Sequence, residues 1–228
     1  MQAHDGAVGK PRDLARGPSA VPRVMPRVPW LTDGGTDGNE RLTASTGLIL
    51  IVLLAVIGVT IVRIGQLTWL HLFVGLLLIG PVALKMASTG YRFARYYTGS
   101  LTYRDKGPPP LVLRAIAPLL ALSTVSVFVT GVVLLFKGPA DRNPLLLIHK
   151  VSFIVWIVFA ALHVLGHLPG VGRSLRAGAT AKRASSISGH AGRAIAMSGA
   201  LVGGLVLAIV LIPDFGLWTS HAAGLHRH

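Results

Sequence analysis

Five long apolar runs set the strongest limit on what this chain can fold into. They lie at residues 42–62, 66–89, 111–136, 145–168 and 194–212. Each is close to the ~20 residues that a helix needs to cross a bilayer, where a helix satisfies its backbone hydrogen bonds within its own segment. Only 13% of the 228 residues are charged, whereas about 25% is typical of a soluble domain. We therefore expect an all-α, polytopic membrane protein.

The runs divide the chain into four parts. Residues 1–41 are rich in glycine, proline and arginine without any period, which predicts a disordered segment. Residues 42–168 hold four spans, and the short first and third connections make consecutive spans antiparallel neighbours in a four-helix bundle. Residues 169–193 form a connection, because Pro169-Gly170 is expected to end the fourth helix. Residues 194–228 hold a fifth transmembrane helix and a short tail.

The basic residues indicate how the chain crosses the membrane. They gather in the N-terminal segment and in the second and fourth connections, and they are sparse on the other side. The positive-inside rule then places the N-terminus in the cytoplasm and the C-terminus outside, in the cell's inner (plasma) membrane. The net charge of +14 therefore marks the cytoplasmic, lipid-facing side and does not indicate a nucleic-acid partner.

Three histidines stand inside these apolar runs. A titratable ring in hydrocarbon is costly, so it is normally paired, hydrogen-bonded or bound to a metal. His149 and His163 are 14 residues apart, which puts both rings on one helix face with a rise of roughly 21 Å. His71 lies on a parallel span at the depth of His149. Because the chain has no cysteine, two such imidazoles could hold the iron of a haem b, which needs no thioether link.

Small and basic residues accompany this pair. Gly75, one turn from His71, would leave room for a flat macrocycle against the helix, and Gly131 could do the same. Basic side chains near this end could pair with the haem carboxylates: Lys137, Arg142 and Lys150. Either histidine taken alone could equally be an interfacial residue bonded to water or to a carbonyl.

The other half of the fourth span offers His163 no matching histidine. Lys85 lies 14 residues after His71, so it should face the same seam as His163. A neutral lysine could bind iron, whereas a charged one would reach for the membrane surface or pair with a haem carboxylate. Met86, beside it, is chemically an easier iron ligand.

The histidine pattern resembles the integral-membrane cytochrome b subunits of bacterial formate dehydrogenases and nickel–iron hydrogenases, and bacterial cytochrome b561-type proteins. The resemblance covers about residues 42–168. It implies four helices that hold two haems, with His71 and His149 matching the outer pair and His163 one ligand of the inner haem. The family's remaining ligand is a histidine near the inner end of the first helix, where residues 41–46 contain none. This departure from the family leaves three alternatives: one haem, two haems with a different inner ligand, or a relative that has lost the function.

Three functions stay open at this point. The first is an electron-transfer subunit of an oxidoreductase, passing single electrons between quinol or quinone and a partner redox protein. The second is a non-redox membrane scaffold or partner subunit, for which the small-xxx-small pair Gly199 and Gly203 would form the contact, including contact with a second copy. The third is a metal-ion permease that uses the histidines of the fourth span, against which the absence of aspartate and glutamate from the spans counts.

Overall fold

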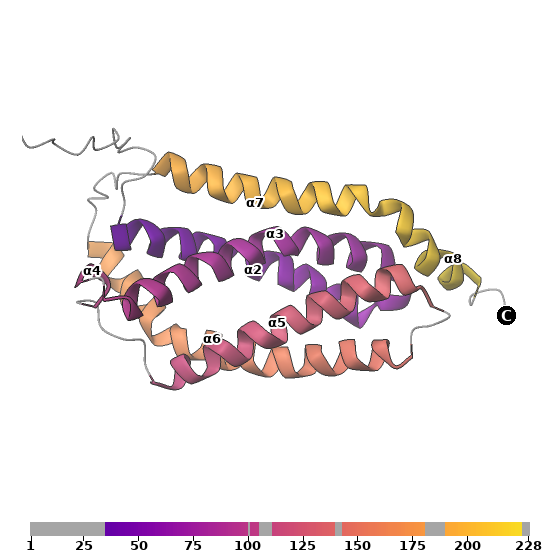
Figure 1. Cartoon of the computed structure of the whole chain (residues 1–228), viewed down its shortest axis with the longest axis horizontal. Helices are drawn as coiled ribbons and strands as arrows, with labels where there is room; N and C mark the ends of the chain where they lie inside the picture. The colour runs from indigo at the N-terminus through magenta and orange to yellow at the C-terminus, as the bar shows by residue number, and fades with distance from the viewer. Residues whose placement is uncertain (1–34, 100, 105–110, 140–142, 181–189, 225–228) are drawn as a thin grey trace, which may run out of the picture.

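The computed structural model describes residues 35–99, 101–104, 111–139, 143–180 and 190–224, and within them the chain forms helices and no strand. The elements are α2 (Gly35–Val62), α3 (Ile64–Tyr97), α4 (Leu101–Arg104), α5 (Leu111–Lys137), α6 (Leu145–Thr180), α7 (His190–Val210), the 3-10 turn η1 (Ile212–Phe215) and α8 (Gly216–Gly224). Figure 1 shows the long helices lying roughly side by side. Five of them are long and apolar enough to cross a membrane: α2, α3, α5, α6 and α7. The chain is therefore an all-α, multi-pass membrane protein, as the apolar runs predicted.

Consecutive spans pair as antiparallel neighbours, which confirms the expectation from the short connections. Only Arg63 separates α2 from α3. The backbone amide of Leu67 donates a 2.9 Å hydrogen bond to the carbonyl oxygen of Arg63. Similarly, α5 packs along α6 over most of its length. At the end of α5, Gly138 has a φ of +70°, a conformation that favours glycine, and its amide bonds the carbonyl of Leu134. We call the end of the bundle where α2 begins the N-terminal end, and the end where α8 lies the C-terminal end.

Three helices are longer than the sequence predicted. The helix α2 begins at Gly35, so the expectation of disorder is wrong for residues 35–41, which are helical. The helix α3 runs to Tyr97, beyond the expected limit at residue 89, and α6 runs to Thr180. The expectation that Pro169-Gly170 ends the fourth helix is wrong. Proline removes one backbone hydrogen bond but keeps a helical φ, and such residues also lie within α3 and α5, as Pro81 and Pro118. Of the predicted connection, residues 181–189 fall outside the part of the chain that the structure describes, as do residues 1–34 of the N-terminal segment.

The helix α7 packs closely against α3 through glycines (Figure 1). A Cβ atom on Gly80 would collide with the backbone carbonyl of Ala200, and one on Gly204 would collide with that of Leu77. These backbones touch because neither glycine has a side chain.

Apolar packing ties the bundle together mainly toward its C-terminal end. Phe128 of α5 packs on a buried cluster of α2 and α3 that includes Ile57 and Leu78. Leu135 of α5 lies in a second cluster with residues of α3, α7 and η1, among them Phe215. By contrast, α6 contacts mainly α5. In its span Leu145–His167, no residue of the most apolar stretch is buried. The α5–α6 pair is thus attached to the rest of the protein through α5.

The segment after α7 is not a simple tail. The turn η1 and the helix α8 cover the C-terminal end, where the Trp218 indole donates a 3.1 Å hydrogen bond to the carbonyl of Leu134. Trp69 stacks on Phe73, with ring centroids 5.1 Å apart, and meets Phe215 edge-on. These contacts join α5 to α8 and α3 to η1. Trp69 and Trp218 therefore both lie at this end.

Candidate functional site

The ring of His71 is held by the helix that precedes its own. Its Nδ1 lies 2.9 Å from the hydroxyl oxygen of Thr60 on α2. Thr60 is fully buried, and its hydroxyl also lies 2.7 Å from the backbone carbonyl oxygen of Ile57. This pairing follows from the one-residue connection at Arg63, which turns α3 directly back along α2. The half-buried imidazole thus has its Nδ1 fixed by a partner on a second helix.

His149 is held in the same way within the other helix pair. Its Nδ1 lies 2.9 Å from the hydroxyl oxygen of Thr130 on α5, and that hydroxyl lies 2.6 Å from the carbonyl oxygen of Ser126. The neighbouring Gly131 makes this approach possible, because a Cβ there would lie 3.1 Å from the His149 Cε1. The imidazole therefore takes the space beside Gly131 that we had expected a macrocycle to use.

The two imidazoles lie at the C-terminal end of the bundle on different helix pairs. His71 comes from α3 and His149 from α6. The equal depth read from the sequence places both near this end. The packing of Phe128 and Leu135 brings α5, and with it α6, against the α2–α3 pair. Neither helix pair alone supplies both rings.

The other residues expected at this end differ in their surroundings. A Cβ on Gly75 would meet no atom within 4 Å, so the space beside it is open. Lys137 and Lys150 are exposed, whereas Arg142 lies outside the described residues. Gly75 thus presents an open helix face, and both lysines lie at the surface.

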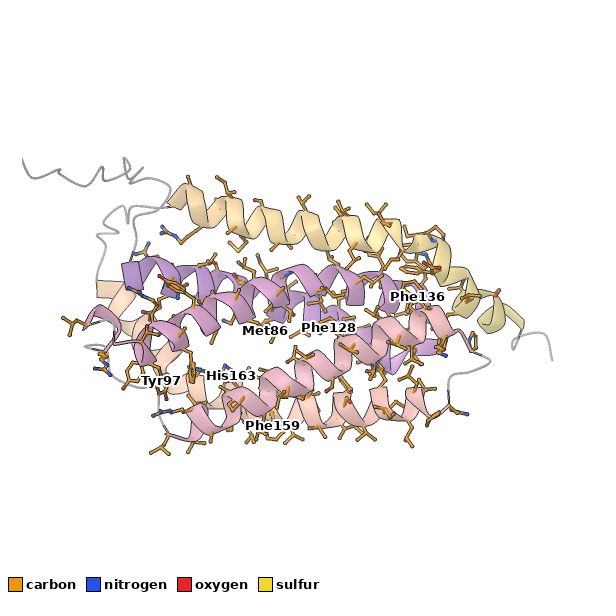
Figure 2. All side chains as sticks on the ribbon, in the orientation of Figure 1. Met86, Tyr97, Phe128, Phe136, Phe159 and His163 are labelled. Atoms are coloured by element: carbon orange, nitrogen blue, oxygen red, sulfur yellow. The ribbon has the colours of Figure 1, made fainter. Side chains whose placement is uncertain are left out.

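The N-terminal end is arranged differently. His163 lies there on α6, with its ring 4.6 Å from that of His167. Its Nδ1 is buried and has no hydrogen-bond partner. Lys85 is close enough to both histidines to interact electrostatically, which agrees with the seam expected from the 14-residue spacing. In Figure 2, His163 and Met86 lie in the same half of the bundle as Tyr97.

Lys85 connects α3 to α2. Its Nζ donates a 2.6 Å hydrogen bond to the carbonyl oxygen of Thr43. The Thr43 hydroxyl in turn lies 3.1 Å from that of Ser88, and the Asn39 amide donates to the Ser88 carbonyl at 3.2 Å. A Cβ on Gly47 would lie 3.2 Å from the same Nζ. The Lys85 side chain thus has a structural partner between the two helices.

Sequence reasoning missed the two threonines that hold the histidines. Thr60 precedes His71 by 11 residues and Thr130 precedes His149 by 19. No fixed spacing links them, because each pairing depends on the length of a connection. Threonine is also common in membrane helices, where its hydroxyl bonds its own backbone.

Comparison with known proteins identifies no relative that would assign a role to these residues. The chain matches no known protein family, no curated protein and no solved structure. Among the described residues there is no cluster of three or more histidine, cysteine, aspartate or glutamate side chains that could hold a metal ion. What the C-terminal end offers is two imidazoles, and a pair of axial imidazoles suits a haem iron, whose other four ligands come from the macrocycle.

Proposed function

We propose that this protein is a membrane b-type cytochrome that holds one haem between His71 and His149. The observation that supports the proposal is that two half-buried imidazoles, one from each helix pair, lie at the same end of an apolar bundle and are each held by a threonine of the preceding helix. Each has its Nδ1 occupied by a threonine, which leaves Nε2 as the atom that can bind iron. The resemblance to cytochrome b subunits points to the same two residues.

The surrounding residues fit such a group. Gly75 offers an open helix face one turn from His71, and the exposed Lys150 is a cation suited to a haem carboxylate at the membrane surface. When bound, haem supplies reversible one-electron transfer. The chain's own part is to fix two rings, to exclude water with the surrounding apolar side chains and to keep the group at one depth.

We infer one haem rather than two. His163 would need a second ligand across the seam, and α2 and α5 carry no histidine. The candidate that the sequence offers on α3 is Lys85, and its Nζ is already bonded to the Thr43 carbonyl. Binding iron would require the lysine to give up both that contact and its proton. His163 as an inner-haem ligand therefore remains an expectation of the resemblance only.

We infer that the electrons pass between quinol or quinone and a partner redox protein. Lipid-soluble quinones reach groups held within apolar spans, and a chain without cysteine carries no thiolate-bound iron–sulfur cluster to extend the route. With the basic N-terminal segment in the cytoplasm of the inner membrane, the haem would lie toward the outside. The protein would then serve as the membrane subunit of a larger oxidoreductase.

A non-redox scaffold is the second candidate, and one observation favours it. Gly199 and Gly203 lie on the exposed face of α7, while Ala200 and Gly204 make the contact with α3. The small-xxx-small pair is thus free to meet another helix or a second copy. Under this alternative the protein would fold without pigment, and Gly203→Leu would change its assembly.

The deciding experiment is the visible spectrum of the detergent-purified chain, combined with haem quantitation. We expect a reduced-minus-oxidised α band typical of b-type haem and one haem per chain. The substitutions His71→Ala and His149→Ala should each remove the band while the protein stays folded by circular dichroism. A colourless wild-type preparation that remains colourless after haem is added would reject the cytochrome and favour the scaffold.

A further inference from the structure

The C-terminal site contains the same local arrangement twice. In each case a threonine on the preceding helix of an antiparallel pair faces the Nδ1 of a histidine at 2.9 Å. In each case the threonine hydroxyl also lies within hydrogen-bonding distance of a carbonyl of its own helix. The two pairs, Thr60 with His71 and Thr130 with His149, come from different helix pairs, so one connection does not explain both.

The protons of these groups can be assigned one by one. A threonine hydroxyl has a single proton to donate. Thr60 lies 2.7 Å from the Ile57 carbonyl oxygen and Thr130 lies 2.6 Å from that of Ser126, and a carbonyl oxygen can only accept. With the hydroxyl proton placed on the carbonyl, the threonine oxygen must accept from the imidazole. The ring proton of each neutral imidazole is then on Nδ1, and Nε2 carries the free lone pair.

We propose that Thr60 and Thr130 are positioning residues that hold His71 and His149 in the Nδ1–H form, so that Nε2 is the nitrogen of each ring that would be free to bind the haem iron. This inference rests on the proposed function, since it concerns how the ligands of that haem are prepared. A hydrogen bond to the ring's other nitrogen fixes the tautomer and the ring plane, and it makes the metal-binding nitrogen more basic.

Other threonines and histidines of the same bundle mark the contrast. Thr124 on α5 also lies 2.6 Å from a carbonyl of its own helix, yet it accepts a 3.0 Å hydrogen bond from the Trp156 indole of α6. It therefore joins the same two helices as Thr130 without touching a histidine. His163 has no threonine partner, and its Nδ1 is left without a hydrogen bond. Among the histidines whose side chains the structure describes, the threonine bonds to Nδ1 are those of His71 and His149.

The test compares threonine variants in matched pairs. Thr60→Val and Thr130→Val remove the hydroxyl at nearly constant volume, and Thr60→Ser and Thr130→Ser keep it. Thr124→Val is the control, because it removes an α5–α6 hydrogen bond of the same kind away from the histidines. Haem affinity and midpoint potential are measured on the purified proteins. The tautomers are measured without haem, by ¹⁵N NMR of protein labelled at the histidine rings, with His71→Gln and His149→Gln used for assignment.

We expect each valine variant to bind haem roughly 10–100-fold more weakly, as is usual when the hydrogen-bond partner of a metal ligand is removed. The midpoint potential should rise, because a less basic imidazole stabilises the oxidised iron less. The serine variants should restore both values, and Thr124→Val should match the wild type. In the haem-free protein both rings should show the Nδ1–H form, and each valine variant should lose that preference at its own ring.

Two results would overturn the inference. One is a wild-type protein whose haem-free His71 and His149 carry their protons on Nε2. The other is a set of valine variants that match Thr124→Val in haem affinity and potential. In the second case the cytochrome itself would still be supported if His71→Ala and His149→Ala lose the haem. If the wild type binds no haem at all, the cytochrome is rejected. The NMR measurement on the haem-free protein then still tests the tautomer.

Discussion

The two ends of the bundle differ in how their histidines are satisfied. At the C-terminal end, each of His71 and His149 has a threonine on its Nδ1 at 2.9 Å. At the N-terminal end, the Nδ1 of His163 is buried without a partner, and the nearby base is Lys85. A buried polar atom without a partner costs about 1–3 kcal/mol. Two histidines on one helix face therefore differ in whether a residue of the next helix fixes their Nδ1: Thr130 does so for His149, and His163 has no such partner.

The two ends of the bundle also differ in packing: apolar contacts dominate at the C-terminal end and polar contacts at the N-terminal end. Phe128, Leu135 and Phe215 join the elements toward the C-terminal end. At the N-terminal end, α2 and α3 are linked by polar contacts through Lys85 and Ser88, and Arg114 of α5 meets the face of Tyr97 at 5.1 Å. A rigid end suits a ligand pair that must keep its geometry. The predictions below test whether this difference is functional.

The largest effect is expected from removing either imidazole of the C-terminal pair. His71→Ala and His149→Ala should each eliminate bound haem, because a single axial imidazole leaves the iron without its second protein ligand. Haem content and the reduced spectrum are the measurements. His167→Ala is the control, since it removes an exposed imidazole from α6 and should leave one haem per chain. A haem that survives both C-terminal substitutions would break the comparison.

The second prediction concerns the unpartnered ring. His163→Leu should leave haem content unchanged and raise the free energy of unfolding by about 1–3 kcal/mol, because it removes a buried atom that has no hydrogen-bond partner. Thermal unfolding in detergent measures the change. His149→Leu should have the opposite effect on stability, because the ring that it removes has a hydrogen-bond partner. If His163→Leu instead lowers the haem content from two to one, the N-terminal end holds a second haem and our inference of one is wrong.

The spans and their pairing were predictable from the sequence, whereas the ends of the helices were not. Hydropathy marks where the chain lies in lipid, and the connections at Arg63 and after Lys137 are too short for any pairing other than antiparallel. The last turns of α3, up to Tyr97, and of α6, beyond Pro169, are helical without being apolar, so no hydropathy pattern marks them. The helix α8 has no apolar stripe from which it could be predicted.

The placement of the two histidines at one end of the bundle was predictable from the sequence, and their hydrogen-bond partners were not. Equal depth and parallel direction are properties of the sequence, and they singled out His71 and His149. The hydroxyls of Thr60 and Thr130 were not predictable, because a hydrogen bond across two helices depends on their rotation and separation. The same reason explains α7, where rotation by one residue makes Ala200 and Gly204 the inner face and leaves Gly199 and Gly203 outside.

The third prediction uses the two glycines of the C-terminal end. Gly131→Ala should weaken haem binding by about 1 kcal/mol, roughly fivefold, because a Cβ 3.1 Å from the His149 Cε1 forces the ring to move. Gly75→Ala meets no atom of the protein within 4 Å, so the haem-free fold should be unaffected. Any loss of haem affinity in Gly75→Ala would therefore indicate that the added methyl group contacts the macrocycle. Equal affinity of Gly75→Ala and wild type would show that the haem does not use that face.

The smallest effect is expected at the exposed charge. Lys150 lies one residue after His149, and its side chain is exposed, so a pair with a haem carboxylate there is screened by water. Exposed ion pairs contribute about 0.2–1 kcal/mol, which corresponds to roughly 10–40 mV for a one-electron couple. Lys150→Gln should shift the midpoint potential downward by about that amount, because removing a positive charge disfavours the added electron. The shift should shrink as salt is raised, and Arg114→Gln, at the opposite end of the bundle, should produce less. A larger response from Arg114 than from Lys150 would place the haem at the N-terminal end and reverse the assignment of the two ends.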